Sequence, residues 1–216
     1  RNESNVGELI DIALTKLEDE NRSKLAMVFR SISFNSETAI GPTRQRNNIL
    51  KNLLTDLNAM DLQPSHLENN DVIGDSYEYL ISNFAGEAGK KAGEFYTPSE
   101  VSTLLAKLVD PQSGDRICDP ACGSGSLLLR IGNEANVRHY YGQELNSTTY
   151  NLARMNMLLH EVSFQDFDIE IGDTLEHPHF GDMRFEAVVA NPPYSANWSA
   201  DAKFFDDERF SSYGKL

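Results

Sequence analysis

The stretch Asp119–Ser126, with the sequence DPACGSGS, decides the fold because it joins an apolar run to a helical pattern through two closely spaced glycines. Glycine lets the backbone approach a ligand closely, and the start of a helix offers unpaired N–H groups. The stretch is not a P-loop, since no Gly-Lys-Ser/Thr follows, and Leu128 stands where the dinucleotide motif has its last glycine. Alone, it favours a nucleotide or cofactor turn over a purely structural one.

The segments around this turn alternate between strand and helix patterns. Strands are predicted at 116–119, 139–144, 167–171 and 186–190, and helices at 97–109, from 126 onward and at 147–160. Such alternation predicts an α/β fold with a parallel, doubly wound sheet. The first of these helices opens on a capping-box pattern, with Thr97 as N-cap, Pro98 at the first helical position and Glu100 completing the box.

The residues before this region have helical spacing only. Apolar residues recur at helical intervals over 6–17, 49–60 and 72–84, with Gly41-Pro42 and Pro64 between the runs. We expect these apolar stripes to form the core of a helical domain over residues 1–85. A Gly- and Lys-rich linker is predicted at 86–94, and the α/β domain at 95–216.

Two further pieces carry chemistry. Glu144 ends the second predicted strand 21 residues after Gly123, near the offset at which a carboxylate meets ribose hydroxyls in such folds. Asn191-Pro192-Pro193-Tyr194 follows the fourth strand, and its prolines make a rigid loop without N–H donors. The Asn191 side-chain oxygen and the Pro192 carbonyl would localise the lone pair of an exocyclic amine on its nitrogen. A planar base, pulled out of a duplex, would stack on Tyr194.

These pieces are expected at one place. Ligands of doubly wound sheets bind beyond the carboxyl ends of the strands, where the strand order reverses. Asp119 and Asn191 end the first and fourth strands, which flank such a point in the expected order 3-2-1-4. Asp173, just after the third strand, belongs to the same rim.

Three motifs in this order resemble a known family. DPACGSGSLLL followed by ANPPY resembles the amino-methyltransferases of the gamma order, and GEFYTPSEVSTLLAKLV upstream is similar to their cofactor-capping motif. With its helical leader, the predicted helical domain over residues 1–85, the chain resembles the modification (M) subunit of type I restriction–modification enzymes, nearest the IC type. The resemblance implies a Rossmann-like class I methyltransferase domain of which the first four strands are present. The motifs expected after the NPPY loop are absent, so we expect the chain to be part of a longer one.

The resemblance also implies residue roles around S-adenosyl-L-methionine, and it implies no metal. Phe95, Tyr96, Thr97 and Pro98 would line the methionine end of the cofactor. Asp119, Ala121, Gly123, Ser124 and Gly125 would form its loop, with Asp119 near the amino group. Glu144 would hold the ribose, Asp173 would contact the exocyclic amine of the cofactor's adenine, and Thr174 or Leu175 would pack on that ring. The catalytic loop of Asn191, Pro192, Pro193 and Tyr194 would bind a flipped-out target adenine.

The charge of the chain bears on its partners. The net charge is -14, whereas binding of DNA phosphates needs clustered Lys and Arg. The resemblance implies double-stranded DNA as substrate, held with the help of a specificity subunit, a second M subunit and a restriction subunit. No apolar stretch reaches the length of a membrane helix, and we expect a cytoplasmic, prokaryotic protein.

Two alternatives stay open. A protein methyltransferase acting on a glutamine amide also has a helical leader and an NPPY loop, and an interaction subunit could keep the fold without cofactor. Two other features favour structural explanations. Cys118 and Cys122 are expected to be small buried thiols, and His177-Pro178-His179 is expected to be a surface turn.

Overall fold

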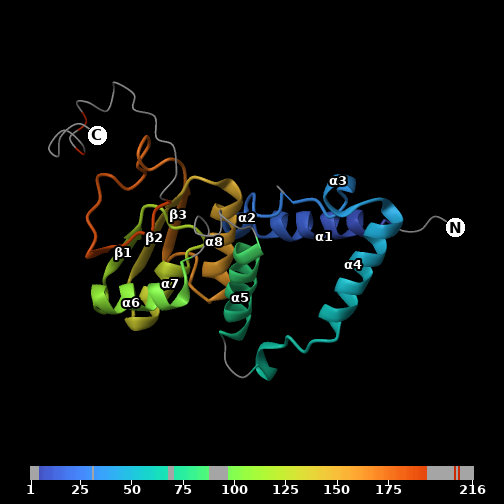
Figure 1. Cartoon of the computed structure of the whole chain (residues 1–216), viewed down its shortest axis with the longest axis horizontal. Helices are drawn as coiled ribbons and strands as arrows, with labels where there is room; N and C mark the ends of the chain where they lie inside the picture. The colour runs from blue at the N-terminus through green and yellow to red at the C-terminus, as the bar shows by residue number, and fades with distance from the viewer. Residues whose placement is uncertain are drawn as a thin grey trace.

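The computed structural model describes residues 5–30, 32–67, 71–87, 97–193, 207 and 209. The helices are α1 (Val6–Glu20), α2 (Arg22–Leu25), α3 (Glu37–Ile40), α4 (Thr43–Asn58), the 3-10 helix η1 (Pro64–His66), α5 (Val72–Glu87), α6 (Ser99–Val109), α7 (Ser126–Glu134) and α8 (Ser147–Leu159). The strands are β1 (Arg116–Asp119), β2 (His139–Glu144), β3 (Phe167–Ile171) and β4 (Ala187–Val188). Figure 1 shows α1 and α4 at one side of the molecule and the sheet at the other. Within the described ranges, every helix is too short or too polar to cross a membrane.

The four strands form one parallel sheet in the order β3-β2-β1-β4. The α/β class, the parallel sheet and the strand order predicted from the sequence are therefore confirmed. β4 is shorter than predicted, because only Ala187 and Val188 pair with β1. The N–H groups of Glu186 and Val189 still donate to the carbonyls of Arg116 and Cys118 on either side of β4. Pro192 then ends the ladder, since proline has no N–H to donate.

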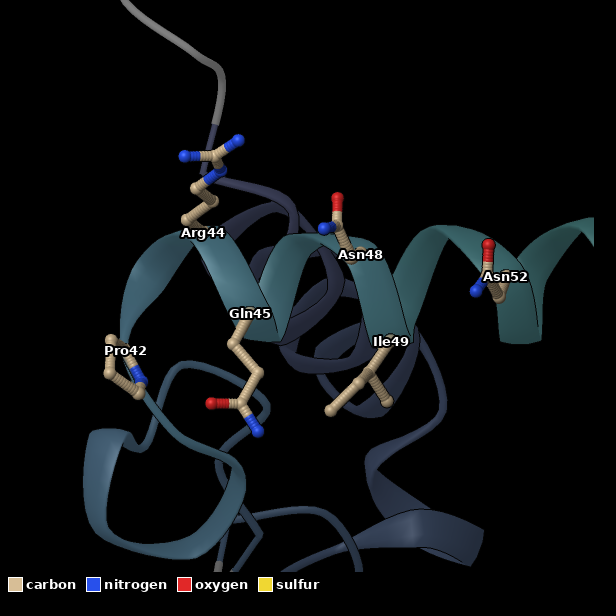
Figure 2. Close-up of a pocket in the computed structure, with 6 residues that line it drawn as sticks. All are labelled: Pro42, Arg44, Gln45, Asn48, Ile49 and Asn52. Atoms are coloured by element: carbon tan, nitrogen blue, oxygen red, sulfur yellow. The ribbon is translucent and has the colours of Figure 1, made fainter.

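The N-terminal helices pack less completely than their apolar stripes predict. α1 packs on α4, and Leu50 of α4 is buried, but Leu53, Leu54 and Leu57 are 43–45% exposed. The expectation that these stripes form a core is wrong for this half of α4, because in Figure 1 the helix leads away from α1 before the chain returns to α5. Figure 2 shows the N-terminal half of α4, where an open cavity of 490 Å³ is lined mostly by polar side chains.

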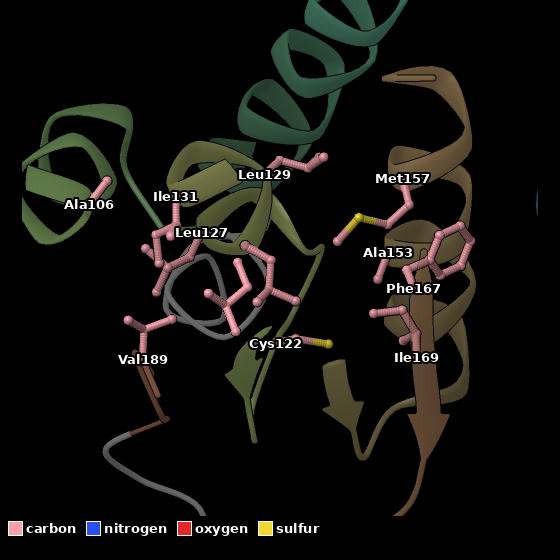
Figure 3. Close-up of a cluster of buried hydrophobic side chains, with 12 residues drawn as sticks. Ala106, Cys122, Leu127, Leu129, Ile131, Ala153, Met157, Phe167, Ile169 and Val189 are labelled. Atoms are coloured by element: carbon pink, nitrogen blue, oxygen red, sulfur yellow. The ribbon is translucent and has the colours of Figure 1, made fainter. Parts of the chain in front are cut away.

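The core of the α/β domain lies where α7 and α8 cover the sheet (Figure 3). Ile117 of β1 and Leu128 of α7 are completely buried, as is Met157 of α8. Both cysteines are also buried and form no disulfide, as the sequence predicted. Burial of so much apolar surface stabilises the domain at about 25 cal/mol per Å². The core thereby holds β1 and β2 in place, and this fixes where the loops at their carboxyl ends begin.

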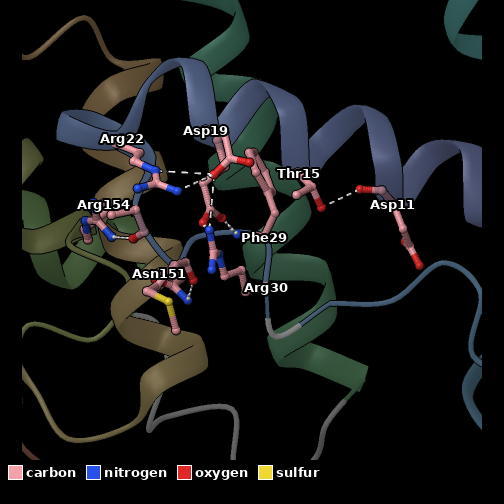
Figure 4. A network of polar contacts seen from close by, with 11 residues as sticks. Asp11, Thr15, Asp19, Arg22, Phe29, Arg30, Asn151 and Arg154 are labelled. Carbon is pink, nitrogen blue, oxygen red and sulfur yellow. Dashed lines mark hydrogen bonds and ion pairs between the residues drawn. The ribbon is translucent and has the colours of Figure 1, made fainter.

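One arginine fastens the helical leader to the α/β domain (Figure 4). Arg154 of α8 is 7% exposed and donates from Nη1 to the carbonyl of Ala26 and from Nη2 to the carbonyl of Lys24, both at 2.8 Å. Asn151, one turn earlier, donates to the carbonyl of Met27 at 3.2 Å. α5 packs on the same helix. The leader therefore contacts the α/β domain through α8, while the predicted boundaries at residues 85 and 94 stay a prediction.

Replacing Arg154 tests this contact. We expect Arg154→Ala to cost about 2 kcal/mol of stability, because it leaves the carbonyls of Lys24 and Ala26 without their donor. For a chain of this size the melting temperature should fall by roughly 4–8 °C in a thermal unfolding scan. Arg22→Ala is the control, since Arg22 forms an exposed ion pair with Asp19 and should change stability by less than ~0.5 kcal/mol. Equal melting temperatures for both variants would contradict the stabilising role of the Arg154 contact with Lys24 and Ala26.

Candidate active site

The turn after β1 has the backbone geometry of a close-approach loop. Gly123 (φ 56°) and Gly125 (φ 78°) both adopt left-handed conformations, and Gly125 is the N-cap of α7. Side chains are disfavoured at such angles, which explains the two glycines. The Ser124 hydroxyl pairs with that of Ser126 at 2.9 Å in the interior. Ser124 can therefore contribute its backbone, but not its hydroxyl, to a ligand in the turn.

Asp119 is a buried carboxyl group at the base of this turn. It is 2% exposed, and its Oδ1 accepts a hydrogen bond from the backbone N–H of Ala121 at 2.9 Å. Burial raises the pKa of Asp119 to about 7; the Ala121 hydrogen bond opposes this rise and the nearby Glu144 charge adds to it. A buried carboxylate without a cation is costly, so this group is suited to receive a positively charged ligand.

Glu144 links the turns that follow β1 and β2. Its Oε2 accepts from the N–H of Gly123 at 3.0 Å, and its Oε1 accepts from the N–H of Asn146 at 2.8 Å. Burial raises the pKa of Glu144, and these backbone hydrogen bonds partly offset the rise. Each carboxylate oxygen has a second lone pair, so both can still accept from a diol.

The loop after β3 closes against the turn after β1. The Thr174 hydroxyl donates to the carbonyl of Pro120 at 2.6 Å. Asp173 accepts the N–H of Leu175 on Oδ1 at 2.9 Å, which fixes the carboxylate at the loop's start. The structure therefore brings Asp173, Thr174 and Leu175 to the edge of the sheet that carries Asp119 and Glu144.

The loop after β4 meets the start of α6. Nδ2 of Asn191 donates to the Thr97 hydroxyl oxygen at 3.3 Å, across 94 residues of sequence. The predicted capping box is wrong, because α6 begins at Ser99 with Pro98 as its N-cap and no side-chain cap. Pro98 has an extended ψ of 142°, so Thr97 lies one residue too early to cap the helix. Its hydroxyl instead fixes the amide of Asn191, whose Oδ1 is thereby the accepting end.

All these loops leave the same edge of the sheet, since parallel strands have their carboxyl ends together. β1 and β4 are neighbours, so the turn at Asp119 and the loop at Asn191 begin side by side. Pro192 and Pro193 continue that loop. Phe95, Tyr96 and Tyr194 lie outside the described residues, and their roles stay predictions. The cavity along α4 lies away from this edge, as do two others, one beside α1 and one between α7 and the segment that follows α8.

Sequence reasoning missed several residues that hold this edge together. The Asn146 side chain accepts from the N–H groups of Thr148 and Thr149 and caps α8, which its position before Ser-Thr-Thr could have indicated. Asn156 donates to the carbonyl of Ser124 at 3.1 Å from within the core. Gln143 binds the His177–His179 segment, which is therefore more than a surface turn. No local pattern marks Asn156 or Gln143.

The fold and this edge define a class of protein. The chain belongs to the N-6 DNA Methylase family, whose model matches residues 68–215. The fold is shared with a putative class I S-adenosylmethionine-dependent methyltransferase from Listeria monocytogenes (18% identity, TM-score 0.53, covering 68% of this chain and 45% of that one).

Relatives within the family are more specific. The type I restriction enzyme MpnII methylase subunit of Mycoplasma pneumoniae is 42% identical over 94% of this chain and 40% of its own length. The HindI methylase subunit of Haemophilus influenzae is 33% identical over 98% of this chain and 48% of its own. The crystal structure of a type I restriction-modification methyltransferase subunit from Streptococcus thermophilus matches with a TM-score of 0.76 and 39% identity, covering 88% of this chain and 41% of that one. The resemblance to type I modification subunits is confirmed, and the chain spans less than half the length of these relatives.

Proposed function

We propose that the protein is the modification subunit of a type I restriction–modification system and methylates the N6 amine of adenine in DNA. S-adenosyl-L-methionine is its methyl donor. The observation that carries this proposal is the common sheet edge at which the Asp119 turn and the Asn191 loop begin side by side. A donor held by the first would present its methyl group to an amine held by the second.

The described residues fit the chemistry of this donor. It has an ammonium, two ribose hydroxyls and an exocyclic amine, and three separate loops each offer one carboxylate. Asp119 would face the ammonium, Glu144 the hydroxyls and Asp173 the amine, while Thr174 or Leu175 would pack on the adenine ring. When bound, the cofactor supplies an electrophilic methyl group on its sulfonium.

The chain's own contribution to transfer is the loop after β4. An aromatic amine is a weak nucleophile because its lone pair is delocalised into the ring. Asn191 Oδ1 and the Pro192 carbonyl accept the two amine hydrogens and localise that lone pair on nitrogen. Pro192 and Pro193 keep the loop rigid, so these acceptors need no reorganisation. Tyr194 stacks on the extruded base, which contributes roughly 1–3 kcal/mol.

The charge of the chain supports the proposal that other subunits help it to bind DNA. Residues 161–216 contain 12 acidic and 4 basic side chains, so this segment repels phosphate. We infer that a specificity subunit holds much of the duplex, with a second modification subunit and a restriction subunit completing the assembly. With these partners, we expect the protein to act in the prokaryotic cytoplasm.

The test is transfer of labelled methyl groups into duplex DNA by the full-length protein, with and without a co-expressed specificity partner. Labelled N6-methyladenine that depends on the partner is the expected product. A release factor offered separately tests the glutamine alternative, and its methylation in place of DNA would replace the proposal. Calorimetry that finds no binding of S-adenosyl-L-methionine would favour a non-catalytic interaction subunit.

Thr97 provides a graded test of the Asn191 loop. We expect Thr97→Val to lower kcat by roughly 10-fold, because it removes the hydrogen bond that orients the Asn191 amide. Thr97→Ser keeps the hydroxyl and should stay within roughly 2-fold of the unchanged protein. Both are measured by single-turnover methyl transfer beside cofactor affinity. If Thr97→Val loses only cofactor affinity, Thr97 lines the methionine end of the cofactor and does not orient Asn191 for transfer.

A further inference from the structure

Gln143 precedes Glu144, the residue proposed to hold the ribose. Its side chain is buried and forms two hydrogen bonds with one loop. It is 1% exposed at the penultimate position of β2. Its Nε2 donates to the carbonyl of His177 at 2.9 Å, and its Oε1 accepts from the N–H of His179 at 3.0 Å. One partner is an acceptor and the other a donor, so only a side chain with both functions satisfies the pair. A buried polar group with such matched partners is costly to replace.

The backbone at the end of β2 binds the loops on both sides of it. The carbonyl of Gln143 accepts from the N–H of Cys122 at 3.0 Å, in the turn after β1. The carbonyl of Glu144 accepts from the N–H of Gly172 at 2.9 Å, at the start of the loop after β3. The end of β2 therefore links both loops, and the Gln143 side chain fixes the far end of the second one.

The loop fixed in this way carries Asp173 near its start. Oδ1 of Asp173 is occupied by the N–H of Leu175, and the carbonyl of Asp173 accepts from the N–H of His177 at 2.7 Å. Oδ2 has no hydrogen-bond partner among the residues that the structure describes. Because His177 bonds to both Asp173 and Gln143, the position of Asp173 depends on the Gln143 amide.

We propose that Gln143 is the positioning residue that gives the proposed cofactor site its selectivity for an adenine base on the methyl donor. It acts through the loop over residues 172–179, by holding the Asp173 carboxylate where it can accept from an exocyclic amine. This inference rests on the proposed function, since it concerns the same cofactor site. Because the Gln143 side chain is buried and its hydrogen bonds go to this loop, its loss would affect recognition of the base and leave the methionine end in place.

The experiment compares two probes by calorimetry on the full-length protein. S-adenosyl-L-homocysteine carries the exocyclic amine, and S-inosyl-L-homocysteine has an oxygen in its place. The unchanged protein should prefer the first by roughly 10- to 100-fold, because a carboxylate accepts from the amine and repels the oxygen. Gln143→Met keeps the length of the side chain but can neither donate nor accept, and should reduce this preference below roughly 3-fold.

Phe167→Leu is the matched control for stability. Phe167 is 4% exposed and begins β3, at the opposite end of that strand from the loop. The control should melt earlier but keep the full preference for the amine-bearing probe. A Gln143→Met protein that folds and keeps the full preference overturns the inference. If Gln143→Met fails to fold, Gln143→Glu, which keeps the acceptor for His179, is measured in its place under the same criterion. Failure of the unchanged protein to bind either probe would instead refute the proposed function.

Discussion

Asn191→Ala should lower methyl transfer by roughly 10²–10³-fold while cofactor affinity changes by less than about 3-fold. The variant removes the Oδ1 acceptor that we propose to polarise the target amine, whereas the cofactor would be held by the Asp119, Glu144 and Asp173 loops. Single-turnover transfer of labelled methyl groups measures the first quantity and calorimetry the second. Loss confined to the chemical step is the pattern for an interaction made only in the transition state.

Asn191→Asp is the matched control for this experiment. Aspartate keeps an acceptor oxygen at the same place, and the Thr97 hydroxyl, which now accepts from Asn191, can donate to it. We expect this variant to retain more transfer than Asn191→Ala. Full turnover of the alanine variant would exclude the assigned role of the loop, and loss of cofactor binding would mean that Asn191 supports the fold.

Asp119→Asn should weaken cofactor binding and stabilise the protein at alkaline pH. The amide keeps the acceptor for the Ala121 N–H but loses the charge that we propose to face the ammonium of the cofactor. We expect affinity at pH 8 to fall by roughly 10- to 100-fold. Affinity of the unchanged protein should decline as pH falls through about 7, where Asp119 gains its proton, and that decline should be absent in the variant.

Asp119 affects stability with the opposite dependence on pH: cofactor affinity should rise with pH, whereas the contribution of Asp119 to the stability of the unchanged protein should fall. The pKa of Asp119 is about 7 in the folded protein and near the ordinary value of 3.8 when unfolded. The folded state therefore binds more protons between these values, so this group's contribution to stability is full below pH 4 and is lost as pH rises to 7. Asp119→Asn should gain about 1–3 kcal/mol at pH 8 and almost nothing at pH 4. Denaturant unfolding at both pH values measures this, and a variant less stable at pH 8 would contradict it.

Local patterns in the sequence sufficed for the sheet. The strand over Arg116–Asp119, the glycine turn and the strand ending at Glu144 lie where they were predicted, because alternation and turn chemistry act over a few residues. The sheet edge followed from topology, since parallel strands place their following loops together. Asp119, Glu144 and Asn191 were therefore within reach of sequence reasoning.

Contacts between residues far apart in the chain could not be predicted from the sequence. The Thr97–Asn191 bond spans 94 residues and the Arg154 contact with Lys24 spans 130, and neither leaves a local pattern. The capping box failed because proline fits both the N-cap and the first helical position. The leucines of α4 recur at the same spacing whether or not a neighbour covers them, so spacing could not reveal their exposure.

The buried acid at position 119 also affects how binding heats are to be interpreted. Near neutral pH, a ligand that needs this group ionised drives its proton into the surrounding buffer. The apparent enthalpy of binding then includes the ionisation enthalpy of that buffer and differs between phosphate and Tris. The slope of that dependence counts the protons released on binding.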